Sequence, residues 1–169
     1  MTLTMSQASI PVFLQGLASL AAILEKAAAQ AAERKIEPAV LLNDRLAPDM
    51  FPLVRQVQIA TDHAKGATAR LAGLEVPKFD DVETTFEELQ QRLSRVRAFV
   101  EGVDPGRIDG SEDREIALPS RGQTRIFRGQ AYLFRFALPN FYFHSTAAYA
   151  ILRHNGIAIG KSDFIGPMS

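Results

Sequence analysis

The feature that most constrains the fold of this chain is a regular series of apolar residues between positions 53 and 74. Its members recur at alternating steps of four and three residues, in the order Leu53, Val57, Ala60, Ala64, Ala67, Leu71 and Leu74. This spacing places them along one side of an α-helix, the pattern by which helices pack in a bundle. The alanines in the middle let another helix come close or leave room for a ligand. Asp49 is expected to cap this helix, with Pro52 in its first turn and Gly73 at its end.

Three more segments show the same helical spacing. They run from about Ser9 to Arg34, from Asp80 or Asp81 to Glu101, and from Pro139 to Gly156. Ser9 can cap the first of them, and Pro11 then falls in the opening turn, where its missing N–H has no helical partner to lose. The chain is therefore predicted to be all-α, an antiparallel four-helix bundle that forms a single domain over residues 1–169.

The charges of the third segment follow the helix dipole. Acidic residues stand in its early turns and basic residues later, in the order Asp81, Glu83, Glu87, Glu88, Arg92, Arg95 and Arg97. This order is favourable because the start of a helix is partly positive and its end partly negative. We expect these side chains to form a solvated outer face.

The helical pattern fails between residues 102 and 138, a long connection for a compact domain. Two weakly alternating runs within residues 115–127, separated by Pro119 to Gly122, predict a small β-hairpin before the last helix. Residues 131–136 are strongly aromatic and are expected to form a helical turn against the bundle. Residues 157–169 are expected to be a tail without regular structure.

Composition excludes several classes of function. Lys plus Arg and Asp plus Glu both total 19, so no net charge draws the chain to nucleic acid or to an anionic membrane. The chain has no cysteine, which removes disulfides, thiolate metal ligands and cysteine nucleophiles. We find no apolar stretch of about 18 residues free of charge and no secretory signal, so we expect a cytoplasmic protein without a membrane span. Phosphate-binding glycine loops and the G-x-S-x-G hydrolase motif are absent as well.

Two of the three histidines are candidates for a functional site. His144 lies three residues after Phe141, so it points with the apolar side of the last helix, and Asn140 lies one turn earlier on that side. His63 lies beside the alanines of the 53–74 series. Inward-facing side chains on different helices are how bundles build metal sites, and imidazole nitrogens suit Zn or Ni. The alternative is that each histidine is only hydrogen-bonded to a backbone carbonyl or to a tyrosine.

Residues 57–73 and 139–166 resemble the DinB/YfiT-like superfamily of four-helix bundles, and more closely an uncharacterised bacterial branch of it. Members hold a divalent metal with one histidine on the second helix and an H-x-x-x-H pair on the last. His63 matches the second-helix ligand. His144 matches the final one, because it stands twelve residues before the glycine of a Leu-Arg-x-x-Gly motif. The resemblance therefore implies a metal site of His63, Asn140 and His144, in which Asn140 replaces a histidine.

A neutral amide oxygen is a weak ligand for zinc or nickel, so this replacement weakens, alters or abolishes metal binding. The first hypothesis is a degenerate, non-catalytic member with a small metal or ligand pocket between the second and fourth helices. The alternative is a divalent-metal-dependent enzyme, of the thiol transferase or hydrolase type, that uses His63 and His144. The catalytic residues and the substrate stay open. The resemblance also implies a homodimer, whose interface could take some of the aromatic residues Phe134, Phe136, Phe141 and Phe143, although core positions are the alternative.

Overall fold

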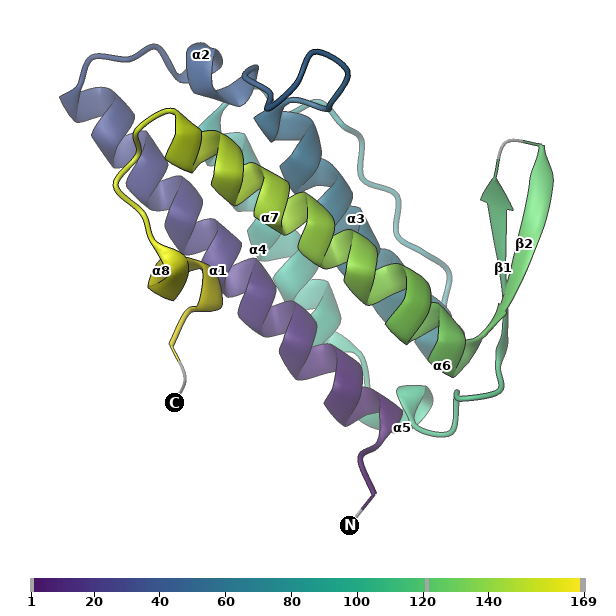
Figure 1. Ribbon diagram of the computed structural model, residues 1–169. Helices are drawn as coiled ribbons and strands as arrows, with labels where there is room; N and C mark the ends of the chain where they lie inside the picture. Colours follow the sequence, from purple (N-terminus) through teal and green to yellow (C-terminus); the bar gives the residue numbers. More distant parts are fainter. Residues whose placement is uncertain (1, 121, 168–169) are drawn as a thin grey trace.

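The computed structural model in Figure 1 describes residues 2–120 and 122–167. The chain is mainly helical and carries one two-stranded antiparallel sheet. The long helices are α1 (Met5–Glu33), α3 (Leu53–Ala72), α4 (Phe86–Gly102) and α7 (Leu138–His154). The short elements are α2 (Pro38–Leu42), α5 (Pro105–Ile108), β1 (Glu115–Ser120), β2 (Gln123–Arg128), α6 (Gly129–Tyr132), the π-helical turn η1 (Leu133–Ala137) and α8 (Lys161–Ile165).

The four long helices lie side by side, but they do not all run antiparallel to their neighbours (Figure 1). The start of α3 contacts α7 through Gln56 and His144. The end of α3 contacts α6, just before α7, through Arg70 and Tyr132. α3 and α7 are therefore antiparallel, as are α1 and α4, whereas α3 with α4 and α1 with α7 run in the same direction. The antiparallel arrangement predicted from the sequence holds for only part of the helix pairs.

The connection between α3 and α4 accounts for the parallel pair. Residues 73–85 form neither helix nor strand. Extended chain of this length reaches about 40 Å, whereas the 20 residues of α3 span about 30 Å. The chain can therefore return along the whole length of α3 before α4 begins.

α1 begins four residues before its predicted start at Ser9. Thr4 caps the helix in a capping box with Gln7. Ser9 is instead buried inside the helix, where its hydroxyl donates to the carbonyl of Met5 at 2.7 Å. Pro11 consequently lies in the second turn rather than the first. The capping box decides where the helix begins, and the proline does not.

α1 is also long and apolar enough to cross a membrane by length and composition alone, contrary to the expectation that no such stretch exists. Its apolar side packs against α4, α7 and α8. The predicted stripe is buried in this contact: Phe13, Leu17, Leu20, Leu24 and Ala27. Within this fold α1 is a core helix.

The predicted apolar series organises α3. Its members within the helix are fully buried: Leu53, Val57, Ala60, Ala64, Ala67 and Leu71. The helix follows Pro52 directly and has no side-chain cap, so Asp49 does not cap it. Gly73 ends the helix as predicted, with a φ of 67° in the left-handed region, which glycine adopts without steric cost.

α4 begins at Phe86 rather than at Asp80 or Asp81. Thr85 is its cap, in a second capping box with Glu88. The predicted apolar stripe is buried: Phe86, Leu89, Leu93, Val96 and Val100. The acidic residues before Thr85 therefore belong to the connection and not to the helix.

The prediction of a solvated charged face is wrong for Arg92, whose side chain is 1% exposed. Its guanidinium contacts three carboxylates, from Asp62 of α3 and from Asp81 and Glu83 of the connection. Arg92 directly precedes Leu93 of the buried stripe, so it lies at the border of the apolar side. The connection folds over this border and encloses it.

The predicted hairpin is present, with Ile116 opposite Phe127 and Leu118 opposite Arg125 in the antiparallel register of β1 and β2. The last helix is longer than predicted, because helical backbone continues from α6 through η1 into α7. Pro139 lacks an N–H and its ring crowds the carbonyl four residues earlier. The wider π turn of η1, directly before it, relieves that crowding.

The end of α7 agrees with the prediction, because Asn155 is its C-cap and Gly156 follows with a φ of 76°. The tail after it is not without structure. α8 packs on α1, and Lys26 of α1 forms a salt bridge of 2.5 Å with Asp163.

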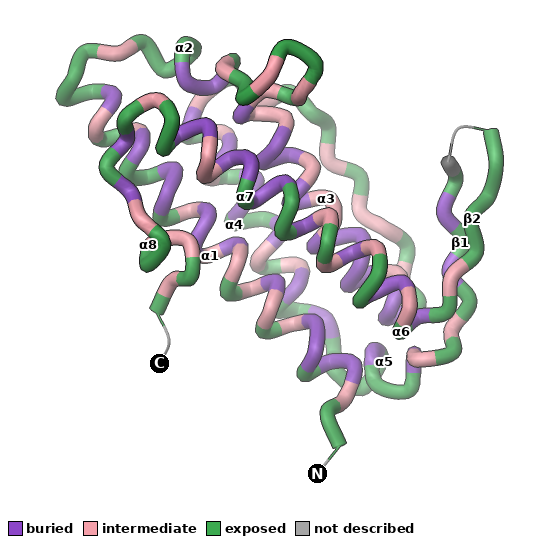
Figure 2. Tube along the Cα trace, in the orientation of Figure 1, coloured by how far each residue is buried: buried purple, intermediate pink, exposed green. Residues whose placement is uncertain are grey.

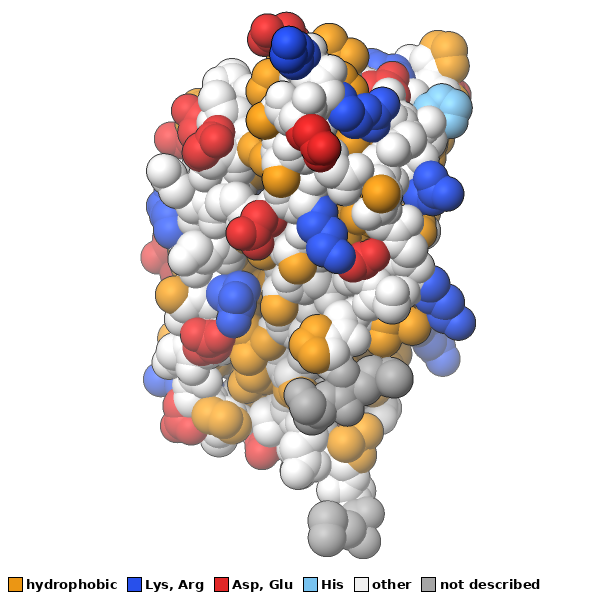
Figure 3. All heavy atoms as spheres, turned by 90° about the vertical axis from the view of Figure 1, so that its left-hand side faces the viewer, with side chains coloured by type: hydrophobic (Ala, Val, Ile, Leu, Met, Phe, Trp, Pro, Cys, Tyr) orange, Lys and Arg blue, Asp and Glu red, His pale blue; other side chains and the backbone are white. Residues whose placement is uncertain are grey.

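Buried residues line the inward sides of the four long helices, whereas exposed residues follow β2 and the outer sides of the helices, and β1 alternates between the two (Figure 2). On the face shown in Figure 3, acidic and basic side chains are interspersed rather than gathered by sign. This agrees with the balanced total charge.

Candidate functional site

His63 and His144 meet in the interior, between α3 and α7. His144 is 9% exposed and His63 is half-buried. Their rings are nearly parallel, with centroids 6.0 Å apart and planes that differ by 11°. Phe136 of η1 packs edge-on against His63, at a centroid distance of 5.6 Å. The structure thus brings together the two histidines that the sequence placed on different helices.

Gln56 sets the tautomer of His144. The Nδ1 atom of His144 lies 2.7 Å from Oε1 of Gln56, while Nε2 of Gln56 donates to the carbonyl of Phe51 at 3.0 Å. Because an amide oxygen only accepts hydrogen bonds, Nδ1 of His144 carries the proton. Nε2 of His144 therefore carries a lone pair rather than a proton. Metal-binding histidines are commonly oriented in this way.

Burial keeps both imidazoles neutral at pH 7. It lowers the pKa of His63 from 6.5 to about 4, with a further lowering from His144 and Arg70 that Asp62 opposes. Burial also lowers the pKa of His144 from its ordinary value, helped by Arg55. Neutral rings can accept a hydrogen bond or bind a metal ion, and they resist protonation.

Asn140 is engaged with its own helix. Its Nδ2 atom donates to the carbonyl of Phe136, one turn earlier, at 2.7 Å. Within residues 2–120 and 122–167, no group of three or more His, Cys, Asp or Glu side chains is placed to hold a metal ion. Of the predicted set, the structure brings together His63 and His144, and within the described residues no hydrogen bond joins Asn140 to either ring.

A cleft of about 360 Å³ opens beside His63. Its walls come from α3, η1 and the hairpin: Asp62, His63, Arg70, Leu118, Pro119, Arg125 and Phe136. Small-molecule sites usually measure roughly 300–1,000 Å³, so this cleft suits a small ligand.

The carboxylate of Asp62, at the wall of the cleft, is already paired. Its Oδ1 atom lies 2.9 Å from Nη2 of Arg92 and 3.0 Å from Nζ of Lys65. Both cationic side chains are at least 95% buried. Asp62 is therefore poorly placed to act as a metal ligand or as a general base.

Sequence reasoning missed Gln56 and Arg70 as members of this site. Both stand seven residues from His63, on either side of it, so all three lie along one face of α3. This spacing was visible in the sequence, but only the structure shows that Arg70 lines a cleft with the hairpin and η1, and that Gln56 contacts His144 of α7.

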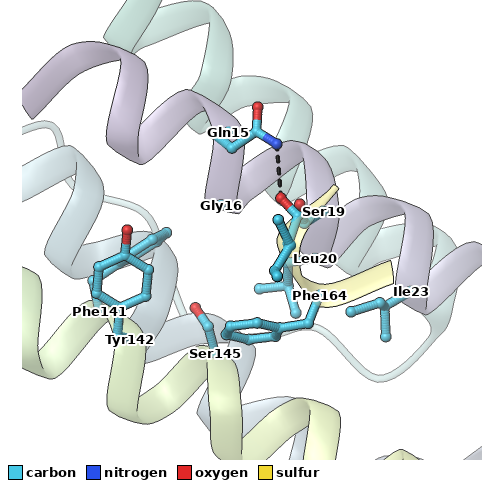
Figure 4. Close-up of a pocket in the computed structure, with 10 residues that line it drawn as sticks. Gln15, Gly16, Ser19, Leu20, Ile23, Phe141, Tyr142, Ser145 and Phe164 are labelled. Atoms are coloured by element: carbon cyan, nitrogen blue, oxygen red, sulfur yellow. Dashed lines mark hydrogen bonds between the residues drawn. The ribbon is translucent and has the colours of Figure 1, made fainter. Parts of the chain in front are cut away.

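A second, smaller cavity of about 70 Å³ lies among α1, α7 and α8 (Figure 4). The hydroxyls of Ser19 and Ser145 border it and find no hydrogen-bond partner within the described part of the chain. No charged side chain lines it. One water needs about 10–15 Å³ of such a volume, so the cavity suits a few buried waters held by the two hydroxyls. We assign it to the packing of α8 and not to the functional site.

Comparison with known proteins supports the resemblance stated above. The profile of a domain of unknown function, DUF1993, matches residues 5–165. The chain belongs to the DUF1993 family. A crystal structure of a DinB family member protein from Shewanella denitrificans is 44% identical to this DUF1993 chain, with a TM-score of 0.91 over 96% of this chain and 92% of that one. No curated protein matches the chain.

These matches place the DUF1993 chain in the DinB-like superfamily, as the sequence motifs predicted. They describe a family whose function is unknown. The function of the pocket therefore has to be argued from its own side chains.

Proposed function

We propose that this chain is a binding protein for a small ligand, without a resident catalytic metal. The ligand is held in the cleft lined by His63, whose ring packs against that of His144. The observation that carries this proposal is the combination of a ligand-sized cleft with an oriented pair of neutral imidazoles. Gln56 fixes the ring of His144 in the tautomer with an unprotonated Nε2. Hydrogen-bonding groups placed at the wall of a partly apolar cleft are typical of small-molecule sites.

The three-histidine metal site implied by the superfamily is not reproduced here. His63 and His144 are suitable donors, but the third position is an amide whose Nδ2 is bound to its own helix. Asp62 is a poor substitute for the third ligand, because its Oδ1 atom is already paired with two buried cations. Two imidazoles without a third strong donor should bind Zn or Ni weakly and release it readily.

This difference gives a direct prediction. Purified protein should keep well under one equivalent of Zn or Ni after dialysis, measured by elemental analysis. The change Asn140→His supplies the missing imidazole one turn before His144, so it should raise metal affinity at least about tenfold in a calorimetric titration. Asn155→His is the matched control, since it adds a histidine outside the pocket.

The proposal would be contradicted if the natural protein tightly held one equivalent of metal. That metal should then be lost in His63→Ala or His144→Ala and kept in His154→Ala. Such a result would support the second candidate, a divalent-metal-dependent enzyme of the thiol transferase or hydrolase type. The proton on Nδ1 of His144, held by Gln56, is the observation that favours that candidate.

The arrangement of α1, α3, α4 and α7 also supports the four-helix bundle expected from the sequence, and one face of it supports a homodimer. Phe143 of α7 is 57% exposed and Phe134 is 46% exposed, whereas Phe141 is buried. The face around Phe143 is lined by Leu46, Met50, Tyr142, Phe143, Thr146, Ala147 and Ala150, of which Leu46, Tyr142, Phe143 and Thr146 are exposed. Such patches commonly mark protein interfaces.

We expect a second copy of the chain to cover this face. Light scattering after size exclusion should give twice the 18.6 kDa of one chain, and Phe143→Asp should shift the protein to monomer. Phe134→Asp, outside this face, is the control. A monomeric natural protein would rule out the dimer without affecting the ligand cleft.

A further inference from the structure

Arg70 is held at the wall of the cleft by its neighbours. It lies in the last turn of α3 and its Nη1 atom donates to the hydroxyl of Tyr132 at 3.1 Å. Tyr132 is fully buried, so it is a fixed anchor. A guanidinium has five N–H donors in a rigid fork, and this contact leaves most of them available.

Gly66 provides the space for that guanidinium. A Cβ atom at position 66 would lie 2.5 Å from Nη1 of Arg70. Glycine in the middle of a helix is less stable than alanine, so its presence in α3 needs a local reason. The close approach of the Arg70 side chain to the helix backbone is that reason.

The cleft has a surplus of positive charge. Arg125 of β2 lines it, is exposed, and forms no salt bridge within residues 2–120 and 122–167. The one acidic residue of the lining, Asp62, is paired with Arg92 and Lys65. His63 is neutral at pH 7 because burial lowers its pKa. Two guanidinium groups thus line the cleft, and among the described residues neither forms a salt bridge with a carboxylate.

The rest of the lining is apolar, formed by Leu118 and Pro119 of the hairpin and by Phe136 of η1. We propose that the cleft binds a small organic anion, with its anionic group between Arg70 and Arg125 and an apolar body against these three side chains. Guanidinium forks match carboxylate and phosphate oxygens in geometry as well as in charge. This inference rests on the proposed function, since it names the ligand class of the same cleft.

Nuclear magnetic resonance titrations of the full chain, in the presence of a metal chelator, test this proposal. Benzoate carries both the anionic group and an apolar body, whereas benzyl alcohol has nearly the same shape without charge. Benzoate should bind saturably and about tenfold or more tightly than benzyl alcohol, the factor expected for one hydrogen-bonded charge pair. Inorganic phosphate and acetate, which lack the apolar body, should bind more weakly than benzoate. Equal binding of benzoate and benzyl alcohol, or no saturable binding of benzoate, would overturn the proposal.

Substitutions locate the site. Arg125→Gln lies on an exposed strand and should fold normally while it weakens benzoate binding about tenfold. Arg153→Gln, an exposed change at the end of α7, should leave binding unchanged. Equal effects of the two substitutions would contradict the assignment to this cleft.

Gly66→Ala gives an independent test, because it displaces the Arg70 guanidinium without removing it. We expect weaker benzoate binding and no loss of thermal stability, since alanine favours the helix. Gly102→Ala is the control, because a Cβ there meets nothing within 4 Å. If Gly66→Ala binds benzoate like the natural protein, Arg70 does not contribute to the site.

The same titration separates this inference from the proposed function. If His63→Ala and His144→Ala bind benzoate like the natural protein, while Arg125→Gln does not, the proposed anion site stands. The two histidines would then not be part of it. Loss of binding in both sets of variants is the expected result.

Discussion

Replacing Arg92 with methionine should lower the free energy of unfolding by about 3 kcal/mol, measured by urea denaturation at pH 7. Removing one partner of a buried ion pair typically costs about 3–5 kcal/mol, because the opposite charges stay behind without compensation. We expect the lower end of this range. Two of the carboxylates involved, those of Asp62 and Asp81, are 38% and 34% exposed, so water partly replaces the lost contact.

The geometry explains why a single side chain has so large an effect. Nε of Arg92 donates to the hydroxyl of Thr61 at 2.7 Å, and Nη1 donates to the carbonyl of Asp80 at 3.1 Å. The remaining contacts are the salt bridges to Asp62, Asp81 and Glu83. Arg92 therefore ties α4 to α3 and to the connection between them, and the connection has no regular structure of its own.

Arg97→Met is the matched control, because it is the same change on the same helix. Arg97 is 42% exposed and lies 3.5 Å from Glu101, one turn later. Exposed pairs of this kind contribute about 0.3–0.5 kcal/mol, so the control should be nearly neutral. If Arg92→Met lowers the free energy of unfolding by less than about 1 kcal/mol, similar to Arg97→Met, the salt-bridge network around Arg92 does not stabilise the fold.

Arg92 is also an example of a feature of the fold that the sequence could not predict. The helical stripes were predictable because they depend on spacing alone, as in the series from Leu53 to Leu71. The burial of Arg92 was not predictable, because it depends on the connection that returns along α3. That connection has no regular spacing of apolar residues. The starts of α1 and α4 were not predictable either. Each lies at a Thr-x-x-Gln or Thr-x-x-Glu capping box, at Thr4 and Thr85, that the apolar pattern does not mark.

The site was predictable to the extent that it lies on helix faces. The apolar neighbours of His144 placed it inward, those of His63 placed it inward or at a helix boundary, and the structure brings the two rings together. Arg125 could not be found in this way, because it comes from a hairpin whose position against α3 no local pattern determines. The role of Asn140 was equally hidden, because an amide can bind a ligand or its own helix, and spacing does not distinguish the two.

Acidification should destabilise the folded chain through His63, by about 2 kcal/mol between pH 7 and about pH 4.5. Burial is the main cause of the low pKa of His63, about 4 against 6.5 for an exposed histidine. At a pH between these two pKa values, His63 is protonated in the unfolded chain but neutral in the folded chain. Stability is therefore unaffected above about pH 7, falls as the pH drops through 6.5, and stops falling from this cause below about pH 4.

The charged and titratable groups around His63 modify the pKa shift that burial causes. His144 and Arg70 lower its pKa and Asp62 raises it. The lowered pKa of His144 acts in the same direction. Carboxylates with lowered pKa values, such as Asp44 and Asp163, contribute stability that is lost only at lower pH.

Urea denaturation of His63→Gln at both pH values isolates the contribution of this ring. The variant should lose about 2 kcal/mol less than the natural protein on acidification, because it has no proton to take up at position 63. His154→Gln, which removes an exposed histidine, should keep the full loss. An unchanged acid response in His63→Gln would mean that His63 can be protonated in the folded chain. In that case the pocket would be wetter than its geometry indicates, and His63 would be a less suitable partner for a neutral ligand group.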